Sequence, residues 1–409
     1  MVELPPEIIE TFLEYLNGDT LERNTHLLRC CLVSKSWYSI AQPLLFSAVR
    51  MTRGHWESPK RSAKQMIQIL CKTLEESSHT RRYIQTLSVE VKSTTSITPL
   101  LRLLKDLRCL RFAFSHTQAP STLPPDLLLY IPDLFRSERF TSLSLTSVRD
   151  FPLSLFAQCL ALQELALSRV TFSGLDDALP RMDAPRPQLR TFVLFNVSWD
   201  EVTIFSWLTA SRSSFDLSKL TTFIAMDRSD SPGIYEKICE FVSFVSGSLE
   251  NLSLDPPTDG QSSGMLRVDR LRNLRTISVW LLQDAEDSIN LLPPILDILR
   301  KLPNPGILEM VELPSEFPPS RFLNELPLSA EIMHSQGWTE FDSLLSSSAF
   351  HNLRVVKITA YEVEDVPTGL EYIGLFTRAL PGLFESDKLC VEATTVSDYV
   401  SRQEQIWFA

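Results

Sequence analysis

The sequence predicts an α/β protein in which a small N-terminal module of three helices precedes a long array of short strands alternating with helices. Two patterns carry this prediction. Apolar residues recur at helical spacing in the first fifty positions, and a strand-like apolar pattern recurs from Arg81 onward. Composition agrees: 44% of the 409 residues are hydrophobic and 22% are charged, which is typical of a chain that folds.

The first predicted helix runs from Glu7 to Leu16. Pro5 and Pro6 precede it, where the fixed φ of proline suits a first helical turn, and Gly18 follows where a C-terminal cap belongs. The apolar positions at helical spacing are Ile8, Ile9, Phe12, Leu13 and Leu16. The pattern therefore predicts a short amphipathic helix.

Two more helices are predicted before Pro43. The second carries the apolar cluster Leu27, Leu28, Cys31, Leu32 and Val33. Ser34 is placed to cap the third, which carries Trp37, Tyr38, Ile40 and Ala41. Three helices in so short a stretch rarely stabilise themselves, so we expect this module to lean on a neighbour or a partner.

The same residues resemble a known family, the F-box. The string L-P-x-E-I ends at Ile8, and the segment from Leu28 to Trp37 contains Cys30, Cys31 and then V-S-K-x-W. The resemblance covers residues 3 to 48, and its two parts stand at the separation expected for the family. It implies that the module docks on the adaptor subunit of a cullin-RING ubiquitin ligase while the following region captures a substrate.

The resemblance also implies which residues form the adaptor-facing or module-core apolar surface. These are Leu4, Pro5, Ile8, Ile9, Leu28, Val33 and Trp37. The segment from Asn17 to His26 is expected to be a loop, longer than in the compact family pattern. An alternative from the residues alone is a helical cap that only seals the end of a repeat array.

Beyond the module, a degenerate L-x-x-L-x-L pattern occurs nine times, with successive starts 22 to 33 residues apart through the first eight. This spacing is that of leucine-rich repeats or slightly longer. The matches are Ile84-Leu87-Val89, Leu107-Leu110-Phe112, Phe140-Leu143-Leu145, Leu162-Leu165-Leu167, Leu189-Phe192-Leu194, Leu220-Phe223-Ala225, Leu249-Leu252-Leu254, Leu274-Ile277-Val279 and Leu353-Val356-Ile358. Leu308-Val311-Leu313 and the segment from Lys388 to Val391 are further candidate strands.

Because side chains alternate along a strand, the last two apolar positions of each match face inward together. Helices are predicted between the strands, with starts at Ser58-Pro59, at Ser198 with Glu201, and at Ser231-Pro232. Right-handed stacking of such units predicts an irregular leucine-rich-repeat solenoid, a curved horseshoe with a parallel concave sheet and convex helices. Regular repeats carry an asparagine ladder three positions after the final leucine; it is absent here, so other groups must bond the neighbouring turns.

The predicted organisation is an adaptor-docking module over residues 1–48 and a solenoid with a C-terminal cap over residues 49–409. Asp255 to Gly264 and Pro303 to Pro319 are expected to be surface excursions that interrupt the array. Ile406, Trp407 and Phe408 are expected to cap the last repeat, because apolar side chains are costly to leave in water. The alternative is a tail motif that a partner reads.

Outward-facing positions of the strands are the candidate target contacts, although a solvated sheet face shows the same residues. The candidates are Gln85, Ser88, Glu90, Arg108, Arg111, Ser142, Ser144, Glu164, Arg190, Arg275 and Lys357.

Charge and cysteine content narrow the function classes. The net charge of −11 argues against general nucleic-acid binding, although thirteen Lys or Arg stand against five Asp or Glu between Arg50 and Arg111. From Tyr361 onward the balance is reversed, at three against nine. Seven cysteines without a CxxC pair favour a reducing compartment. The acidic start does not resemble a signal peptide and no apolar stretch is long enough to span a membrane, so a cytoplasmic or nuclear location is expected.

Searches for catalytic, phosphate-binding and metal-binding patterns return nothing, so no catalytic residue, cofactor or metal is predicted. Taken with the resemblance, the prediction is a non-enzymatic substrate-recognition subunit of an SCF-type ubiquitin ligase, with an adaptor and an unknown protein substrate as partners. The alternative is a repeat scaffold that works outside any ligase. A deep polar pocket with a strongly shifted titratable group would instead indicate an enzyme.

Overall fold

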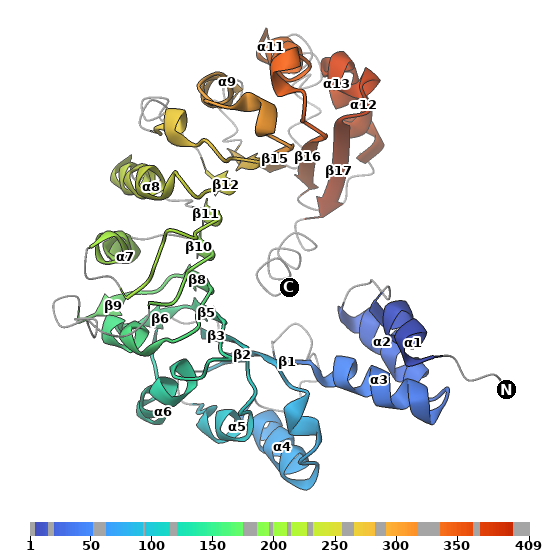
Figure 1. The fold of residues 1–409 in the computed structure, drawn as a ribbon, viewed down its shortest axis with the longest axis vertical. Helices are drawn as coiled ribbons and strands as arrows, with labels where there is room; N and C mark the ends of the chain where they lie inside the picture. The colour runs from blue at the N-terminus through green and yellow to red at the C-terminus, as the bar shows by residue number, and fades with distance from the viewer. Residues whose placement is uncertain are drawn as a thin grey trace. The chain divides into compact units, whose positions relative to one another are not determined.

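The computed structural model describes residues 5–14, 20–51, 63–92, 95–114, 121–174, 186–195, 199–210, 214–226, 232–255, 266–282, 292–316, 336–362 and 369–395. The chain divides into two compact units, Met1–Leu162 and Gln163–Ala409. Both combine helices with parallel strands (Figure 1). The predicted mixed α/β class is therefore confirmed.

The first unit begins with the three predicted helices, α1 (Pro6–Glu14), α2 (Thr20–Cys31) and α3 (Lys35–Phe46). The Pro5 carbonyl accepts the first hydrogen bonds of α1, from the backbone N–H groups of Ile8 at 3.1 Å and Ile9 at 3.2 Å. Ser34 caps α3 as expected, because its Oγ accepts a hydrogen bond from the Trp37 N–H at 3.4 Å. Leu16 and Gly18 lie outside the described residues.

Two predicted boundaries in this module are wrong. The segment expected as a loop up to His26 is helical from Thr20, because good helix formers such as Leu21, Glu22 and Arg23 continue α2 toward its N-terminus without any apolar periodicity to mark them. The third helix does not stop before Pro43 but runs through it to Phe46. Proline removes one backbone donor, and the remaining hydrogen bonds and packing keep the helix intact.

Strands of the first unit pair in parallel in the order β1 (Ala48–Met51), β2 (Thr86–Val91), β3 (Cys109–Phe114) and β5 (Ser142–Thr146). Their register aligns Val49, Leu87, Leu110 and Leu143 in one row. The connections contain α4 (Ala63–Glu76), η2 (Thr80–Arg82), α5 (Thr98–Leu103), β4 (Ser121–Thr122) and α6 (Pro125–Phe135). After β5 come β6 (Val148–Arg149), which pairs with β4, then β7 (Phe151–Pro152) and η3 (Leu153–Gln158).

The second unit continues the same construction. Its parallel strands, in spatial order, are β8 (Glu164–Ser168), β10 (Thr191–Phe195), β11 (Thr222–Met226), β12 (Asn251–Leu254), β13 (Thr276–Val279), β15 (Met310–Glu316), β16 (Val355–Glu362) and β17 (Leu389–Thr395), with β14 (Leu281–Leu282) beside β15. The other elements are β9 (Phe172–Ser173), α7 (Trp199–Thr209), α8 (Pro232–Val245), η5 (Val268–Arg270), α9 (Leu292–Arg300), η7 (Pro305–Ile307), α11 (Gln336–Leu345), η8 (Ser348–Phe350), α12 (Gly369–Ala379) and α13 (Pro381–Glu385). Figure 1 shows α7 and α8 on one side of these strands.

The predicted apolar triplets form the core between strands and helices. Every residue of the nine matches is at most 4% exposed, as are Leu308, Val311 and Leu313. Aromatic rings join strands to helices: the Phe223 centroid of β11 lies 5.0 Å from that of Phe241 in α8, which lies 4.8 Å from Phe205 of α7. The inward orientation predicted from period-two alternation is therefore confirmed.

The segment from Pro303 to Pro319 is not the surface excursion that the sequence suggested. It contains β15, which pairs with β13 on one side and β16 on the other. The prolines of this segment favoured a loop in the sequence analysis, because proline is uncommon within a paired strand. Pro314 nevertheless lies within β15. The other expected excursion, after Asp255, lies outside the described residues, as do Ser58-Pro59, Ser198 and the C-terminal Ile406-Trp407-Phe408.

Asparagines bond neighbouring turns in the second unit, but not at the position where regular repeats carry them. The side-chain amides of Asn273, Asn304 and Asn352 donate to the backbone carbonyls of Gly247 (2.7 Å), Arg272 (3.1 Å) and Gly306 (2.5 Å), respectively. Each asparagine precedes a strand, and each acceptor belongs to the preceding turn. These asparagines thus bond backbone carbonyls between neighbouring turns, as expected for an array that lacks the usual asparagine ladder.

Candidate functional site

The N-terminal module has a small core of its own. Ile9 and Leu13 of α1 pack with Leu27 of α2 and Ala41 of α3, and all four are at most 1% exposed. Trp37 packs against this cluster while its ring makes an edge-on contact with Phe12 at a centroid distance of 5.5 Å. A core this small leaves most apolar side chains of the module without room to be buried.

Those apolar side chains lie on the surface of the module. The exposed ones are Ile8, Phe12, Leu28, Leu32, Val33, Tyr38 and Phe46. Leu32 and Val33, in the turn after α2, are 87% and 62% exposed. Large apolar side chains exposed in this number on so small a module are typical of a surface that takes part in binding.

The structure divides the residues that the resemblance singled out. Pro5, Ile8, Leu28 and Val33 are exposed and available to a partner. Ile9 is fully buried, so it can influence docking only through the fold of the module. Trp37 is half-buried: part of its side chain packs on the core of the module and part is accessible to a partner. Leu4 lies outside the described residues.

Four exposed apolar residues of the module were not among the predicted site residues: Phe12, Leu32, Tyr38 and Phe46. Phe12 follows Ile8 by four residues and Leu32 follows Leu28 by four, and i,i+4 neighbours share a helix face, so this spacing was a usable signal. Tyr38 and Phe46 of α3 gave no such signal.

The outward faces of the strands are less uniformly exposed than predicted. Glu164, Arg108, Arg190 and Arg275 are exposed, and Gln85, Glu90, Ser142 and Lys357 are half-buried. Ser88, Arg111 and Ser144 are buried, at 2%, 7% and 7% exposure, so the prediction that they face solvent is wrong. They occupy one register row across β2, β3 and β5, where neighbouring side chains only ~4.8 Å apart shield one another.

Charged groups meet on the outward face of the last strands. The Lys357 Nζ of β16 lies 3.0 Å from the Glu392 Oε2 of β17, and Glu312 of β15 is in register with Lys357. Burial raises the pKa of the Glu312 carboxyl; the nearby Lys357 opposes this rise and Glu392 adds to it. The arrangement holds carboxylates in fixed positions but supplies no acid-base pair aimed at a cavity.

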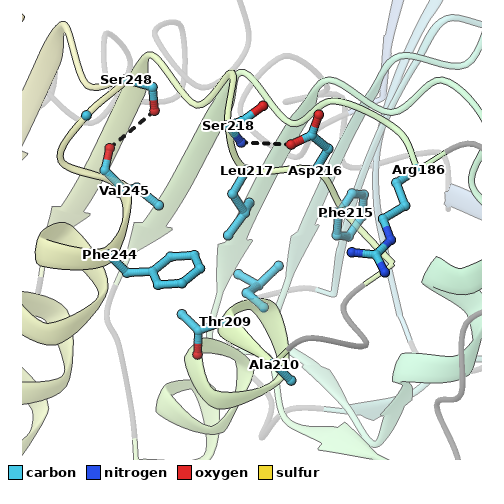
Figure 2. A pocket seen from close by; sticks show the side chains of 12 residues that line it. Arg186, Thr209, Ala210, Phe215, Asp216, Leu217, Ser218, Phe244, Val245 and Ser248 are labelled. Atoms are coloured by element: carbon cyan, nitrogen blue, oxygen red, sulfur yellow. Dashed lines mark hydrogen bonds between the residues drawn. The ribbon is translucent and has the colours of Figure 1, made fainter.

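A pocket of about 910 Å³ lies between the ends of α7 and α8 (Figure 2). Of the residues that line it, Arg186 and Asp216 are the ionisable ones. The Asp216 Oδ1 accepts a hydrogen bond from the Ser218 N–H at 2.9 Å, so this carboxylate stabilises a turn. The lining pairs no nucleophile with a base, and so this pocket does not nominate a reaction.

The cysteines behave as packing residues. All seven carry free thiols. Burial raises the pKa of the Cys239 thiol to about 12 and that of Cys159 well above its ordinary value, so both remain protonated and unreactive at neutral pH. In the part of the chain that the structure describes, no group of His, Cys, Asp and Glu side chains is arranged to hold a metal ion.

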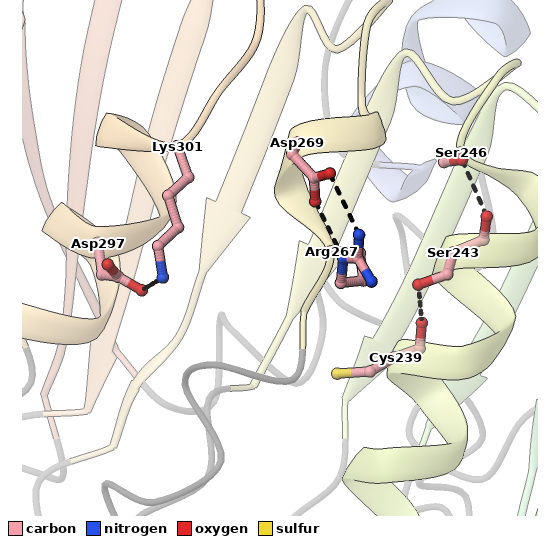
Figure 3. A network of polar contacts seen from close by, with 7 residues as sticks. All are labelled: Cys239, Ser243, Ser246, Arg267, Asp269, Asp297 and Lys301. Atoms are coloured by element: carbon pink, nitrogen blue, oxygen red, sulfur yellow. Dashed lines mark hydrogen bonds and ion pairs between the residues drawn. The ribbon is translucent and has the colours of Figure 1, made fainter.

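Figure 3 shows polar side chains of the second unit that bond to near neighbours in the sequence. The Ser243 Oγ donates to the Cys239 carbonyl at 2.8 Å, which satisfies a helix carbonyl of α8. Arg267 pairs with Asp269 at 3.2 Å, and Lys301 pairs with Asp297 at 2.5 Å. These contacts stabilise turns and helix ends. Among the described helices, none combines the length and apolarity that crossing a membrane requires.

The N-terminal module is therefore the strongest candidate site: a helical protein-docking module with its own core and an uncovered apolar surface. The family model described as F-box-like matches residues 1–51, which include α1, α2, α3 and β1. This match supports an F-box protein and, in general terms, a role with a ubiquitin-ligase adaptor. The strands after β1 lie outside the match, and no curated protein matches the chain.

Proposed function

We propose that this chain is the substrate-recognition subunit of an SCF-type cullin-RING ubiquitin ligase, working in the cytoplasm or nucleus without catalytic activity of its own. The F-box-like module docks the adaptor subunit, and the strand array, an irregular leucine-rich-repeat solenoid, binds the target protein. The observation that carries the proposal is the exposed apolar surface of the module within the stretch that matches the F-box-like model.

Several large apolar side chains of the module are in contact with water. Ile8 and Leu28 are each 54% exposed although they are large and apolar. Covering such a side chain contributes roughly 1.5 to 3 kcal/mol, so a surface with several of them binds a complementary partner with useful affinity. The implied contact residues Pro5, Ile8, Leu28 and Val33 are all available for this role.

Target binding by the array is supported by its outward side chains, which are mixed in chemistry. Exposed Arg108, Glu164, Arg190 and Arg275 stand on or beside rigid parallel strands. Rigid elements that present varied side chains in fixed register suit the recognition of a specific protein surface.

The test is a pull-down of the purified adaptor subunit by the full chain. A double variant, Ile8→Glu with Leu28→Glu, places charges on the exposed surface without entering the core. We expect it to lose at least about tenfold in affinity, because each buried charge costs more than the apolar contact it replaces. Substituting Trp37 is a poorer test, since this residue also packs on the core.

Leu129→Glu is the matched control, because Leu129 is an equally apolar residue of α6 that is 81% exposed and lies outside the module. It should bind the adaptor like the wild type. If the folded wild-type chain fails to bind the adaptor, or if both variants bind equally well, the ligase proposal is wrong.

The second candidate is a scaffold whose module only caps the array. It is favoured by the direct connection between α3 and the sheet: the Ser47 carbonyl accepts hydrogen bonds from the N–H groups of Gln85 and Thr86, both at 2.9 Å. Under this alternative the wild type would not bind the adaptor, and removing the module would lower the stability of the remaining chain.

A further inference from the structure

The loops that lead into β2, β3 and β5 lie side by side at one edge of the first unit. The Arg108 N–H donates to the Gln85 carbonyl at 2.8 Å, and the Thr141 N–H donates to the Arg108 carbonyl at 2.9 Å. These backbone bonds place three successive turns next to each other, at the ~4.8 Å spacing of paired strands.

Cationic side chains dominate these three turns. We call them the basic edge; its members are Arg81, Arg82, Lys105, Arg108, Arg136 and Arg139. The same turns contain two carboxylates, Asp106 and Glu138. Four members, Arg81, Arg82, Lys105 and Arg108, belong to the stretch between Arg50 and Arg111 in which basic residues outnumber acidic ones.

Half of the basic edge has a structural explanation. The Arg81 guanidinium donates to the carbonyls of Leu74 and Glu75 at the end of α4, a common use of a cation at a helix C-terminus. Arg136 contacts Asp133 and donates to the Gln158 Oε1 at 2.7 Å, and Arg139 pairs with Asp106.

Arg82, Lys105 and Arg108 have no such explanation. All three are exposed, and within the described part of the chain none of them makes an ion pair. Asp106, the carboxylate nearest in sequence to Lys105 and Arg108, is already engaged by Arg139. Among the described residues, the positive charge of these three side chains is therefore not neutralised by an ion pair.

The corresponding edge of the second unit is arranged differently. Arg275, which precedes β13, lies 3.7 Å from Glu250 and 2.6 Å from Glu309 of the neighbouring turns. Arg354 lies 3.9 Å from Glu309. Charges there alternate from turn to turn and compensate one another, so the cationic surplus of the first unit is not a general consequence of this architecture.

We infer that the basic edge is a docking surface for an acidic segment of a partner protein, distinct from the adaptor surface and sharing Arg108 alone with the outward-strand candidates. An extended chain whose carboxylates are one or two residues apart can reach Arg82 in one turn and Lys105 and Arg108 in the next. Three cations in neighbouring turns match a short acidic peptide, whereas binding of a nucleic-acid backbone typically draws on about 6 to 10 phosphate contacts.

The test measures binding of a fluorescein-labelled, glutamate-rich peptide of about eight residues, long enough to span the three turns. Fluorescence anisotropy with the full chain should report binding that weakens between about 50 and about 300 mM salt, because screening shortens the reach of exposed charges. The variant Arg82→Glu with Arg108→Glu should lose about tenfold in affinity, since two attractions become repulsions.

A control with the same change in net charge is Lys219→Glu with Arg272→Glu, both exposed residues of the second unit. It should bind the peptide within about twofold of the wild type, because distant exposed charges are screened. If the charge reversal disturbs folding, the neutral double variant Arg82→Gln with Arg108→Gln tests the same residues. We expect it to lose less affinity for the peptide than the reversal does. Equal binding by all variants, no binding by the wild type at low salt, or preferred binding of a single-stranded oligonucleotide would each overturn the inference.

Discussion

Asp342 of α11 joins elements that are far apart in the sequence. Its carboxylate oxygens accept hydrogen bonds from the backbone N–H groups of Gly382 and Leu383, both at 2.9 Å, at the start of α13. The side chain is only 8% exposed, and a methyl group on Gly382 would come within 3.0 Å of it. Asp342 therefore acts as a cap supplied from another helix.

Removing this cap should destabilise the fold. Asp342→Ala removes the acceptor of the buried Leu383 N–H and of the part-buried Gly382 N–H, so we expect a loss of about 1 to 3 kcal/mol in the free energy of unfolding by urea. Asp297→Ala, which removes one partner of an exposed pair, should cost less than about 1 kcal/mol. Comparable losses from the two variants would contradict the capping role of Asp342.

Glu312 makes stability depend on pH. Its pKa is raised mainly by burial, so the folded state favours the protonated carboxyl. A raised pKa means that this group's stabilising contribution is complete below the ordinary glutamate value and is lost as pH rises through the raised value. Lys357 lowers and Glu392 raises the pKa of this carboxyl, but burial is the largest influence, so the net shift is upward.

Glu312→Gln should therefore become more stable relative to the wild type as pH rises. We expect urea midpoints of the two proteins to be closest at about pH 4 and to separate, in favour of the variant, by about pH 7.5. Exposed Glu385, replaced by Gln, serves as the control. If the wild type instead becomes more stable than the Glu312 variant as pH rises, the effect of Lys357 on the Glu312 pKa is larger than that of burial.

Among the elements, successive turns of the second unit are held together by asparagines placed just before strands. Asn273 and Asn352 each precede the first leucine of a strand pattern, in the sequence N-L-R. Because the acceptor carbonyls belong to the preceding turn, each bond ties one strand-helix unit to the next. Regular repeats use a position after the strand for the same purpose.

Loss of one such bond should weaken the contact between two turns. Asn352→Ala is expected to lower the free energy of unfolding by about 1 kcal/mol, the usual net value of one hydrogen bond. Ser343→Ala, at an exposed position of α11, should stay within about 0.5 kcal/mol of the wild type. Indistinguishable urea midpoints for the two variants would mean that water can replace Asn352 as the donor to the Gly306 carbonyl without loss of stability.

For the whole molecule, the surfaces with different chemistry lie on different parts of the chain. Apolar residues are exposed on the module at the N-terminus, whereas uncompensated cations gather at the basic edge of the first unit. In the second unit, Arg275 and Arg354 pair with Glu250 and Glu309 of neighbouring turns, and the last strands hold carboxylates such as Glu392. Such a division suits a protein that binds several partners at once, as the proposed ligase subunit must.

The sequence by itself determined the strands of the repeated apolar pattern, their inward faces and the presence of three N-terminal helices. Leu87, Leu165 and Ile277 could be assigned to the core because period-two alternation and local spacing carry that information without reference to distant residues. Only the tertiary structure decided that Ser88 and Arg111 are buried, that Asp342 caps α13, and that uncompensated arginines and lysine share an edge. These features depend on neighbours tens of residues away, which strand register and turn stacking bring together.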